Sequence, residues 1–118
     1  MKESDYSKYI VKLLKGRGAV VNVNTASIYD TVGRADVEAC YKGYYLAFEL
    51  KTGNYQPDPL QIEYLKDIRN AGGIGLLLRD NEGVAELIKV LSYIDNEVMH
   101  NYHMPKLPYV EVSEVVYD

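Results

Sequence analysis

Cysteine and long apolar runs are the features that this sequence most clearly lacks. One cysteine, Cys40, occurs in 118 residues, which excludes an internal disulfide and a multi-cysteine zinc site. Such sparse cysteine usage fits a reducing, cytoplasmic setting. No apolar run approaches the roughly 20 residues that a membrane span needs, and the first residues are too polar for a signal peptide. We therefore expect one globular domain in the cytoplasm, with no part in a membrane.

An excess of basic residues is also missing. The chain has 13 lysines and arginines and 17 aspartates and glutamates, so its net charge is −4. This balance argues against a general nucleic-acid coat protein, because such proteins are usually basic. It does not exclude an enzyme that holds a metal with carboxylates and grips phosphates locally. Twelve tyrosines, with one phenylalanine and no tryptophan, suit half-buried faces and an oligomer contact.

The apolar pattern predicts three helices and four strands. Helical spacing of apolar residues alternates with short apolar runs, and glycine or proline stands at several boundaries. Asp58-Pro59 has the form of a helix N-cap followed by proline at the first helical position. The predicted elements are a helix over 4–15, strands over 19–24, 35–41 and 44–51, a helix from Pro59 to about Ala71, a strand over 74–80 and a helix over 84–98.

The order of these elements predicts an α/β fold. Three neighbouring strands with short links favour an antiparallel meander. The helix after Pro59 then crosses over and brings strand 74–80 parallel to strand 44–51. The result is a mixed central sheet flanked by helices within residues 1–98. Residues 99–118 form a tail for which an edge strand, a dimer arm and a disordered end all stay open.

The charged residues of the predicted hairpin share one face. The stretch YKGY at 41–44 predicts a turn with Lys42-Gly43 as a two-residue loop. In that register Asp36 lies directly opposite Glu49 on the neighbouring strand. Lys51 lies two residues beyond Glu49, so its side chain points to the same face. The other face of the hairpin is apolar.

Two carboxylates directly opposite each other across a strand pair repel. One explanation for Asp36 and Glu49 is a divalent cation between them, since oxygen ligands suit magnesium and manganese. The other is a salt bridge at the rim of the sheet, in which Lys51 offsets part of the repulsion. The hairpin pattern alone leaves both explanations open.

Two further residues have alternative roles. Gln61 is on the inward stripe of its helix and can reach the carboxylates. It also matches a capping box with Asp58, in which glutamine at the third helical position bonds back to the cap. Glu3 is on the inward stripe of the first helix and can lend another carboxylate, although a frayed and solvated N-terminus is the other reading.

Four basic residues are candidate phosphate contacts. A solvated surface position is the alternative for each, and the four are Lys15, Arg17, Arg34 and Lys42. The signatures of a P-loop, of a dinucleotide fold and of a serine hydrolase do not occur in the sequence.

The hairpin and the helix after it resemble the PD-(D/E)XK nuclease superfamily, and within it a stand-alone VRR-NUC domain. This is a small virus-type replication and repair nuclease related to archaeal Holliday-junction resolvases, and such domains are common in phage-type genomes. The strings GRADVEACYKGYYLAFELKTG and PLQIEYLKDIRNAGGIGLLLRD carry the resemblance. It covers roughly residues 3–98 and implies a restriction-endonuclease-like core in the order α-β-β-β-α-β. The family's usual proline before the aspartate is Ala35 here.

The resemblance implies a role for each matching residue. Asp36 and Glu49 bind Mg²⁺ or Mn²⁺, together with the backbone carbonyl of Leu50. Lys51 orients the attacking water and stabilises negative charge on the scissile phosphate. Gln61 supports this catalytic cluster. The carboxylate of Glu3 reaches the metal through water.

The expected function is therefore a Mg²⁺-dependent endonuclease that cuts branched DNA, such as a Holliday junction, in DNA repair. We expect a homodimer, because symmetric cutting of a four-way junction needs two sites, and a partner protein that recruits it. Two rivals stay open. One is a non-catalytic nucleic-acid-binding module that keeps the fold, against which the intact set of Asp36, Glu49 and Lys51 argues. The other is a protein-interaction domain in which these charges form only a salt bridge.

Overall fold

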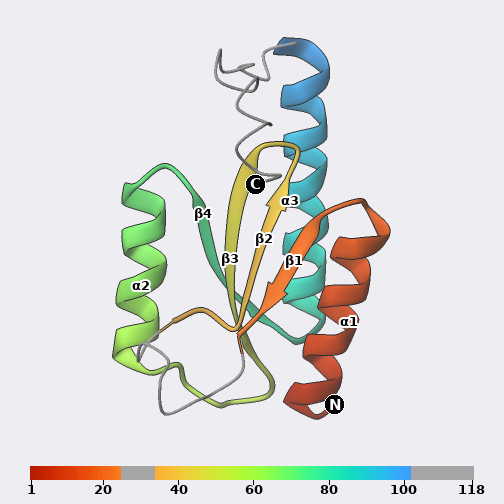
Figure 1. The fold of residues 1–118 in the computed structure, drawn as a ribbon. Coiled ribbons are helices and arrows are strands. Elements are labelled where there is room, and N and C mark those ends of the chain that lie inside the picture. Colours follow the sequence, from red (N-terminus) through yellow and green to blue (C-terminus); the bar gives the residue numbers. More distant parts are fainter. Residues whose placement is uncertain (25–33, 102–118) are drawn as a thin grey trace, which may run out of the picture.

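The computed structural model describes residues 1–24 and 34–101. In this part of the chain three helices and four strands alternate as the sequence predicts (Figure 1). They are α1 (Glu3–Gly16), β1 (Val20–Val23), β2 (Val37–Tyr41), β3 (Tyr44–Lys51), α2 (Pro59–Asn70), β4 (Ile74–Arg79) and α3 (Asp80–Asn101). The predicted loop over 25–33 and the tail from residue 102 lie outside the described residues.

The four strands form one mixed sheet in the order β1-β2-β3-β4. The first two neighbouring pairs are antiparallel, and β3 pairs with β4 in parallel. The hairpin register is the predicted one, with Tyr41 opposite Tyr44 and Val37 opposite Phe48. Lys42 and Gly43 both have positive φ, at 49° and 87°, as a two-residue hairpin turn of the favoured kind requires.

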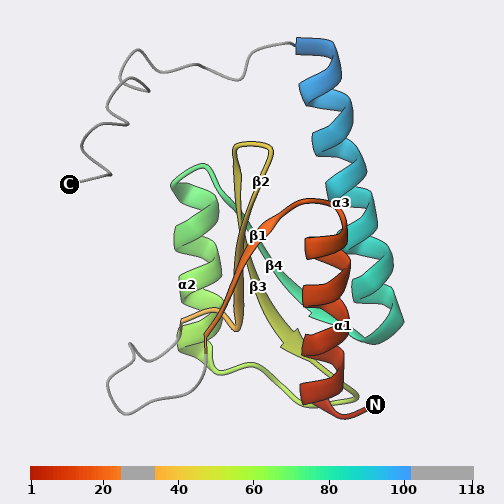
Figure 2. The same ribbon diagram turned by 45° about the vertical axis from the view of Figure 1, so that its right-hand side comes forward.

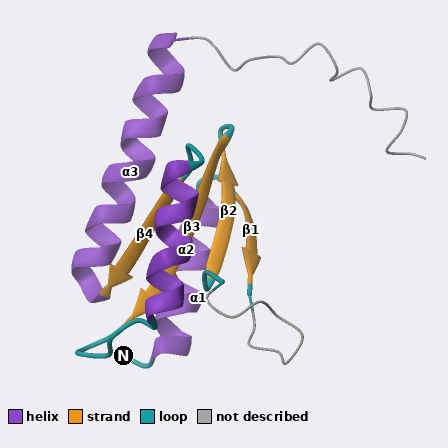
Figure 3. Ribbon diagram, turned by 90° about the vertical axis from the view of Figure 1, so that its left-hand side faces the viewer, coloured by secondary structure: helices purple, strands orange, loops and turns teal. Residues whose placement is uncertain are grey.

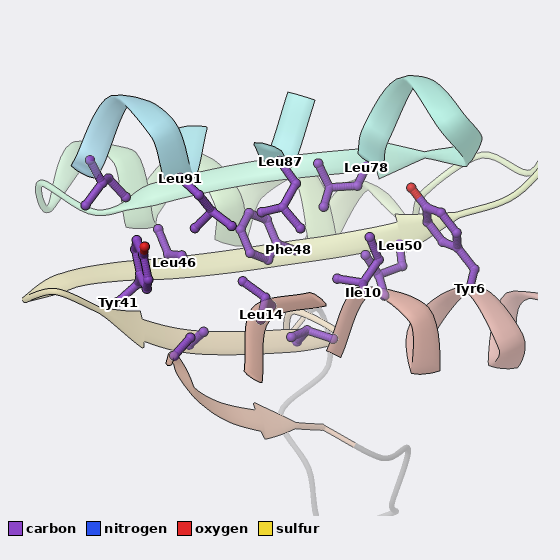
Figure 4. Packing of buried hydrophobic residues seen from close by; sticks show 14 residues of the cluster. Tyr6, Ile10, Leu14, Tyr41, Leu46, Phe48, Leu50, Leu78, Leu87 and Leu91 are labelled. Carbon is purple, nitrogen blue, oxygen red and sulfur yellow. The ribbon is translucent and has the colours of Figure 1, made fainter. Parts of the chain in front are cut away.

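The sheet has α2 on one face and α1 with α3 on the other (Figures 1 and 2). Apolar side chains from α1, α3 and one face of all four strands form the main core. Figure 4 shows Phe48 at its centre, between Leu87 of α3 and Leu14 of α1. The smaller core under α2 contains Ala35, Ala47 and Leu65.

The last helix is longer than the sequence pattern predicts, because it begins at Asp80 and continues to Asn101. The sequence pattern predicts a helix over 84–98 only. In the structure Gly83 lies in the first turn of α3, where an added Cβ would approach the backbone of Leu78 to 2.8 Å. The glycine thus permits close packing of α3 on the end of β4. Helix α3 extends past the hairpin end of the sheet (Figure 3).

No helix in the described ranges combines the length and the apolar character needed to cross a bilayer. This agrees with the absence of long apolar runs in the sequence.

Helix α2 packs unusually close to β4 at Gly75. A Cβ at this position would lie 2.6 Å from the backbone oxygen of Leu65 and 3.2 Å from its carbonyl carbon. Backbone atoms in the middle of a helix cannot move aside as a flexible side chain would. The glycine is therefore required for the position of α2, whose Leu65 packs on Ala35 and Ala47, the residue two before Glu49 in β3.

Gly75→Ala is expected to lower the free energy of unfolding by about 2–3 kcal/mol, because overpacking against a fixed backbone strains the structure. Urea denaturation followed by circular dichroism measures this change. Gly16→Ala is the matched control, since no atom lies within 4 Å of the Cβ position there and alanine favours helix. Equal stability of the Gly75 variant and the wild type would contradict the close approach of α2.

Candidate functional site

Asp36 is held between the two strands that neighbour its own. It lies one residue before β2, where its backbone oxygen accepts a hydrogen bond from Asn24 N at 2.9 Å. Its carboxylate oxygen Oδ2 accepts another from Leu50 N, also at 2.9 Å. The first bond continues the β1–β2 ladder past its last pair, and the second ties the aspartate side chain to β3. Because Oδ2 takes the amide bond, Oδ1 is the oxygen left to bind a ligand.

Glu49 is fully buried in β3, with 0% of its surface exposed. Neither carboxylate oxygen accepts a hydrogen bond from any described residue. Lys51 Nζ lies 3.3 Å from Oε1, which is an ion-pair distance without the alignment of a hydrogen bond. A buried carboxylate without hydrogen bonds is costly, so this arrangement indicates a site adapted to a bound group.

The protonation of Glu49 reflects this environment. The pKa of Glu49 is raised to about 8, first by burial and then by the negative charge of the nearby Asp36 carboxylate. The ammonium of Lys51 acts in the opposite direction but does not outweigh burial. A group with a net positive charge placed between the two carboxylates would favour the ionised form of Glu49.

Lys51 and Glu3 complete the cluster. Lys51 Nζ lies 3.8 Å from Glu3 Oε1 in the first turn of α1. The N-terminal end of α1 therefore lies beside the end of β3, away from the hairpin turn (Figure 3). A cavity of about 220 Å³ opens at this place, lined by Glu3, Ser4, Ser7, Val23, Asn24, Asp36 and Leu50. The structure thus brings together Glu3, Asp36, Glu49 and Lys51, and their roles in catalysis and metal binding stay predictions.

These groups fit a hard divalent cation in their chemistry. Asp36 Oδ1 and the two oxygens of Glu49, which accept no hydrogen bond from a described residue, are anionic oxygen donors of the kind that Mg²⁺ and Mn²⁺ prefer. The N–H and C=O of one strand residue point to the same neighbour, so the Leu50 carbonyl also faces the Asp36 side. Among the described residues, no three His, Cys, Asp or Glu side chains form a group that could hold a metal. The expected ligand set has two carboxylates at its centre, with the carbonyl and water as the other donors.

Gln61 lies in the capping box of α2. Its Oε1 accepts a hydrogen bond from Asp58 N at 2.9 Å, and the Asp58 carboxylate accepts one from Leu60 N at 2.8 Å. Of the two alternatives in the sequence, the structure thus shows the capping interaction. A contribution of Gln61 to the carboxylate cluster stays a prediction.

Three of the expected phosphate contacts lie far from the cluster. Lys42 is in the hairpin turn, and the eight residues of β3 separate this turn from Lys51 by roughly 25 Å. Lys42 and Arg17 both pair with Asp95 of α3, at 2.7 Å and 3.6 Å. Lys15 is exposed in the last turn of α1. The structure does not bring these residues to the site, and their contact with DNA stays a prediction.

Arg34, the fourth expected contact, belongs to a polar cluster under α2. Its guanidinium lies 3.4 Å from the carboxylate of Glu38, which also accepts a hydrogen bond from Tyr64 Oη at 2.8 Å. Burial acts to raise the pKa of Glu38, but the hydrogen bonds from Tyr64 and Arg34 outweigh it, so the pKa lies below the ordinary value. This cluster fixes the chain just before and after Asp36.

The sequence analysis misses the role of Asn24. Its side-chain amide donates to the backbone oxygen of Ala35 at 2.7 Å, and its backbone N–H donates to Asp36. The two bonds hold the segment that carries the aspartate. Polar residues at a strand end are common, so the only sequence signal was an asparagine directly after an apolar run. Ser4 and Ser7 of α1, which line the cavity, carried no signal at all.

The site therefore presents two carboxylates, an ammonium group and an open cavity at one end of the sheet. Such a group can hold a cation beside an anionic substrate and offer a positive charge to it. Comparison of the sequence with protein-family models and with curated proteins finds no match. The geometry of this cluster is therefore the feature that points to a function.

Proposed function

We propose that this protein is a metal-dependent endonuclease that hydrolyses phosphodiester bonds in branched DNA. The observation that carries the proposal is Glu49, a fully buried carboxylate whose oxygens accept no hydrogen bond from the described residues, beside Asp36 and 3.3 Å from Lys51. A salt bridge at the rim of the sheet does not account for this burial.

Each residue has a defined task in this proposal. Asp36 Oδ1, the oxygens of Glu49 and the Leu50 carbonyl would hold the ion, and Glu3 would reach it through water. A bound Mg²⁺ or Mn²⁺ supplies charge neutralisation and an activated water. Lys51 orients this water and stabilises the negative charge that grows on the scissile phosphate. Lysine suits the position because its ammonium is a compact donor on a flexible stem.

The fold supports the proposal at a coarser level. The order α1-β1-β2-β3-α2-β4, with a mixed sheet between helices, is compatible with the restriction-endonuclease-like core of the PD-(D/E)XK superfamily. A VRR-NUC-like protein of this size would act as a homodimer on a four-way junction, with one site for each of two strands. A recruiting partner would offset the weak attraction of a chain with a net charge of −4 for DNA.

The test incubates the purified protein with labelled four-way junction, flap and linear duplex, each with Mg²⁺, Mn²⁺ or EDTA. We expect cleavage of at least one branched substrate with Mg²⁺ or Mn²⁺, and none with EDTA. Asp36→Asn is the sharpest variant, because the asparagine oxygen can still accept from Leu50 N while the ligand charge is lost. It should abolish cleavage without unfolding the protein.

Lys89→Ala is the control, since Lys89 is exposed on α3 and belongs neither to the carboxylate cluster nor to the lining of its cavity. Binding of junction without any cleavage would favour the non-catalytic nucleic-acid-binding module. Absence of both binding and cleavage would favour the protein-interaction domain.

A further inference from the structure

A second concave surface runs along α1 beside the edge strand β1. It is a groove of about 840 Å³, lined by Ser4, Ser7, Lys8, Val11, Lys12, Lys15, Gly16 and Val23. The floor contains small and apolar side chains, whereas three lysines provide the charge. No acidic residue is among these lining residues. The walls of the groove are thus mostly apolar, and its positive charge comes from the ammonium groups of these three lysines, on a chain of negative net charge.

The three lysines of the groove have no acidic partner among the described residues, unlike Arg17 and Lys42. Lys8, Lys12 and Lys15 are exposed, and none forms an ion pair with a described residue. Arg17 and Lys42, in contrast, are paired with acidic side chains. Unpaired lysines are able to exchange their counterions for the phosphates of a nucleic acid.

The groove is continuous with the cavity at the carboxylate cluster. Ser4, Ser7 and Val23 line both of them, and Asp36 lines the cavity. A chain lying in the groove would thus lead directly to the proposed metal site. This continuity distinguishes the groove from a scattered set of surface lysines.

We propose that this groove binds the sugar-phosphate backbone of the DNA strand that is cut, on the segment next to the scissile phosphate. The inference rests on the proposed nuclease function for the identity of the strand. Lys8 and Lys15 are seven residues apart on α1, which is about 10.5 Å along the helix axis. This length allows the lysines to contact more than one phosphate of the same strand.

The test measures binding rather than cleavage, so that it is independent of the metal site. Fluorescence anisotropy with a labelled single-stranded DNA in EDTA gives Kd at several salt concentrations. The double variant Lys8→Ala/Lys12→Ala should raise Kd at low salt at least about tenfold and reduce the slope of log K against log salt by about 1.4. Alanine is a strong helix former, so α1 should remain folded.

Lys66→Ala/Lys89→Ala has the same net charge and replaces two exposed lysines on α2 and α3. It should leave Kd within about twofold and the slope unchanged. Equal loss of affinity in both double variants would contradict DNA binding in the groove, because it would show a nonspecific effect of net charge. Wild-type affinity in the Lys8/Lys12 variant would overturn it as well.

The same measurements separate the groove from the nuclease activity. DNA binding that depends on Lys8 and Lys12, in a wild-type protein that cuts no substrate, would support the groove and contradict the nuclease. Metal-dependent cutting with an unchanged rate in the double variant would support the nuclease and contradict the groove. An RNA of the same sequence is the second arm, and loss of affinity for RNA alone would contradict a groove for the cut DNA strand.

Discussion

Lys51→Met should reduce the rate of DNA cleavage by about two to three orders of magnitude while Mg²⁺ binding persists. Methionine keeps much of the aliphatic stem of the lysine and removes only its charge. In the proposed reaction this charge acts on the phosphate and on the water, not on the ligands of the ion. The variant therefore separates chemistry from metal binding.

The geometry explains why the ion should still bind. Lys51 Nζ lies 3.3 Å from Glu49 Oε1, where it would repel a dication that shares this oxygen. Its removal leaves Asp36 and Glu49 in place. Because Lys51 lowers the pKa of Glu49, the variant should be measured at about pH 9, where the carboxylate can lose its proton.

Two measurements on the same samples test this prediction. Single-turnover cleavage gives the rate, and the shift of the melting temperature on addition of Mg²⁺ reports binding to the folded state. Asp36→Asn should lose both signals, whereas Lys89→Met should keep both. Undiminished cleavage by Lys51→Met would exclude the proposed role of the ammonium. Loss of the metal-induced shift together with cleavage would show that Lys51 acts by holding the ligands.

The hairpin at the centre of the site could be predicted from the sequence because its register depends on local chemistry. Gly43 tolerates the positive φ of a two-residue turn, and the turn then fixes which residues face each other. Alternation along a strand puts Glu49 and Lys51 on one face, and the ion pair between them agrees with this.

Contacts between elements far apart in the sequence could not be predicted in the same way. Lys42 and Arg17 both pair with Asp95, which connects the hairpin and the end of α1 to α3. No spacing of residues in the sequence predicts these ion pairs. The same is true of the lysines of α1. The sequence predicts a phosphate contact at Lys15 but not at Lys8 or Lys12, because the groove that the three share forms only when α1 packs beside β1.

The burial of Glu49 is the property of the site that the sequence predicts least well. The sequence allowed Glu49 to be a rim residue paired with Lys51, and only the packing of the folded sheet shows that it is fully enclosed. This difference has a measurable consequence for stability, which distinguishes a metal site from a stabilising salt bridge.

Glu49→Gln should raise the melting temperature of the metal-free protein by about 10 °C at about pH 8.5. The pKa of Glu49 is about 8 in the folded protein, against an ordinary value of 4.5. The folded state thus binds this proton more tightly than the unfolded chain, and the free energy of unfolding falls as the pH rises from about 4.5 to about 8. The cost above that range is on the order of a few kcal/mol, and glutamine removes it.

Thermal melts in EDTA across this pH range measure the effect. The wild type should lose stability as the pH rises, the variant should show a flatter profile, and the two should agree near pH 4, where Glu49 is protonated in both states. Glu86→Gln, at an exposed position of α3, is the matched control and should follow the wild type. Mg²⁺ at about pH 8.5 should stabilise the wild type and leave the Glu49 variant unchanged, since the ion needs this carboxylate.

A structural ion pair between Lys51 and Glu49 predicts the opposite change, a lower melting temperature for Glu49→Gln. If Lys51 stabilised the fold through Glu49, glutamine would remove the closer carboxylate from a largely enclosed ammonium, leave only Glu3 at 3.8 Å, and lower the melting temperature at about pH 8.5. A lower melting temperature together with no response of the wild type to Mg²⁺ would therefore exclude the metal site. A higher melting temperature with a lost Mg²⁺ response would show that this carboxylate is retained at a cost to stability, as expected of a residue that serves catalysis.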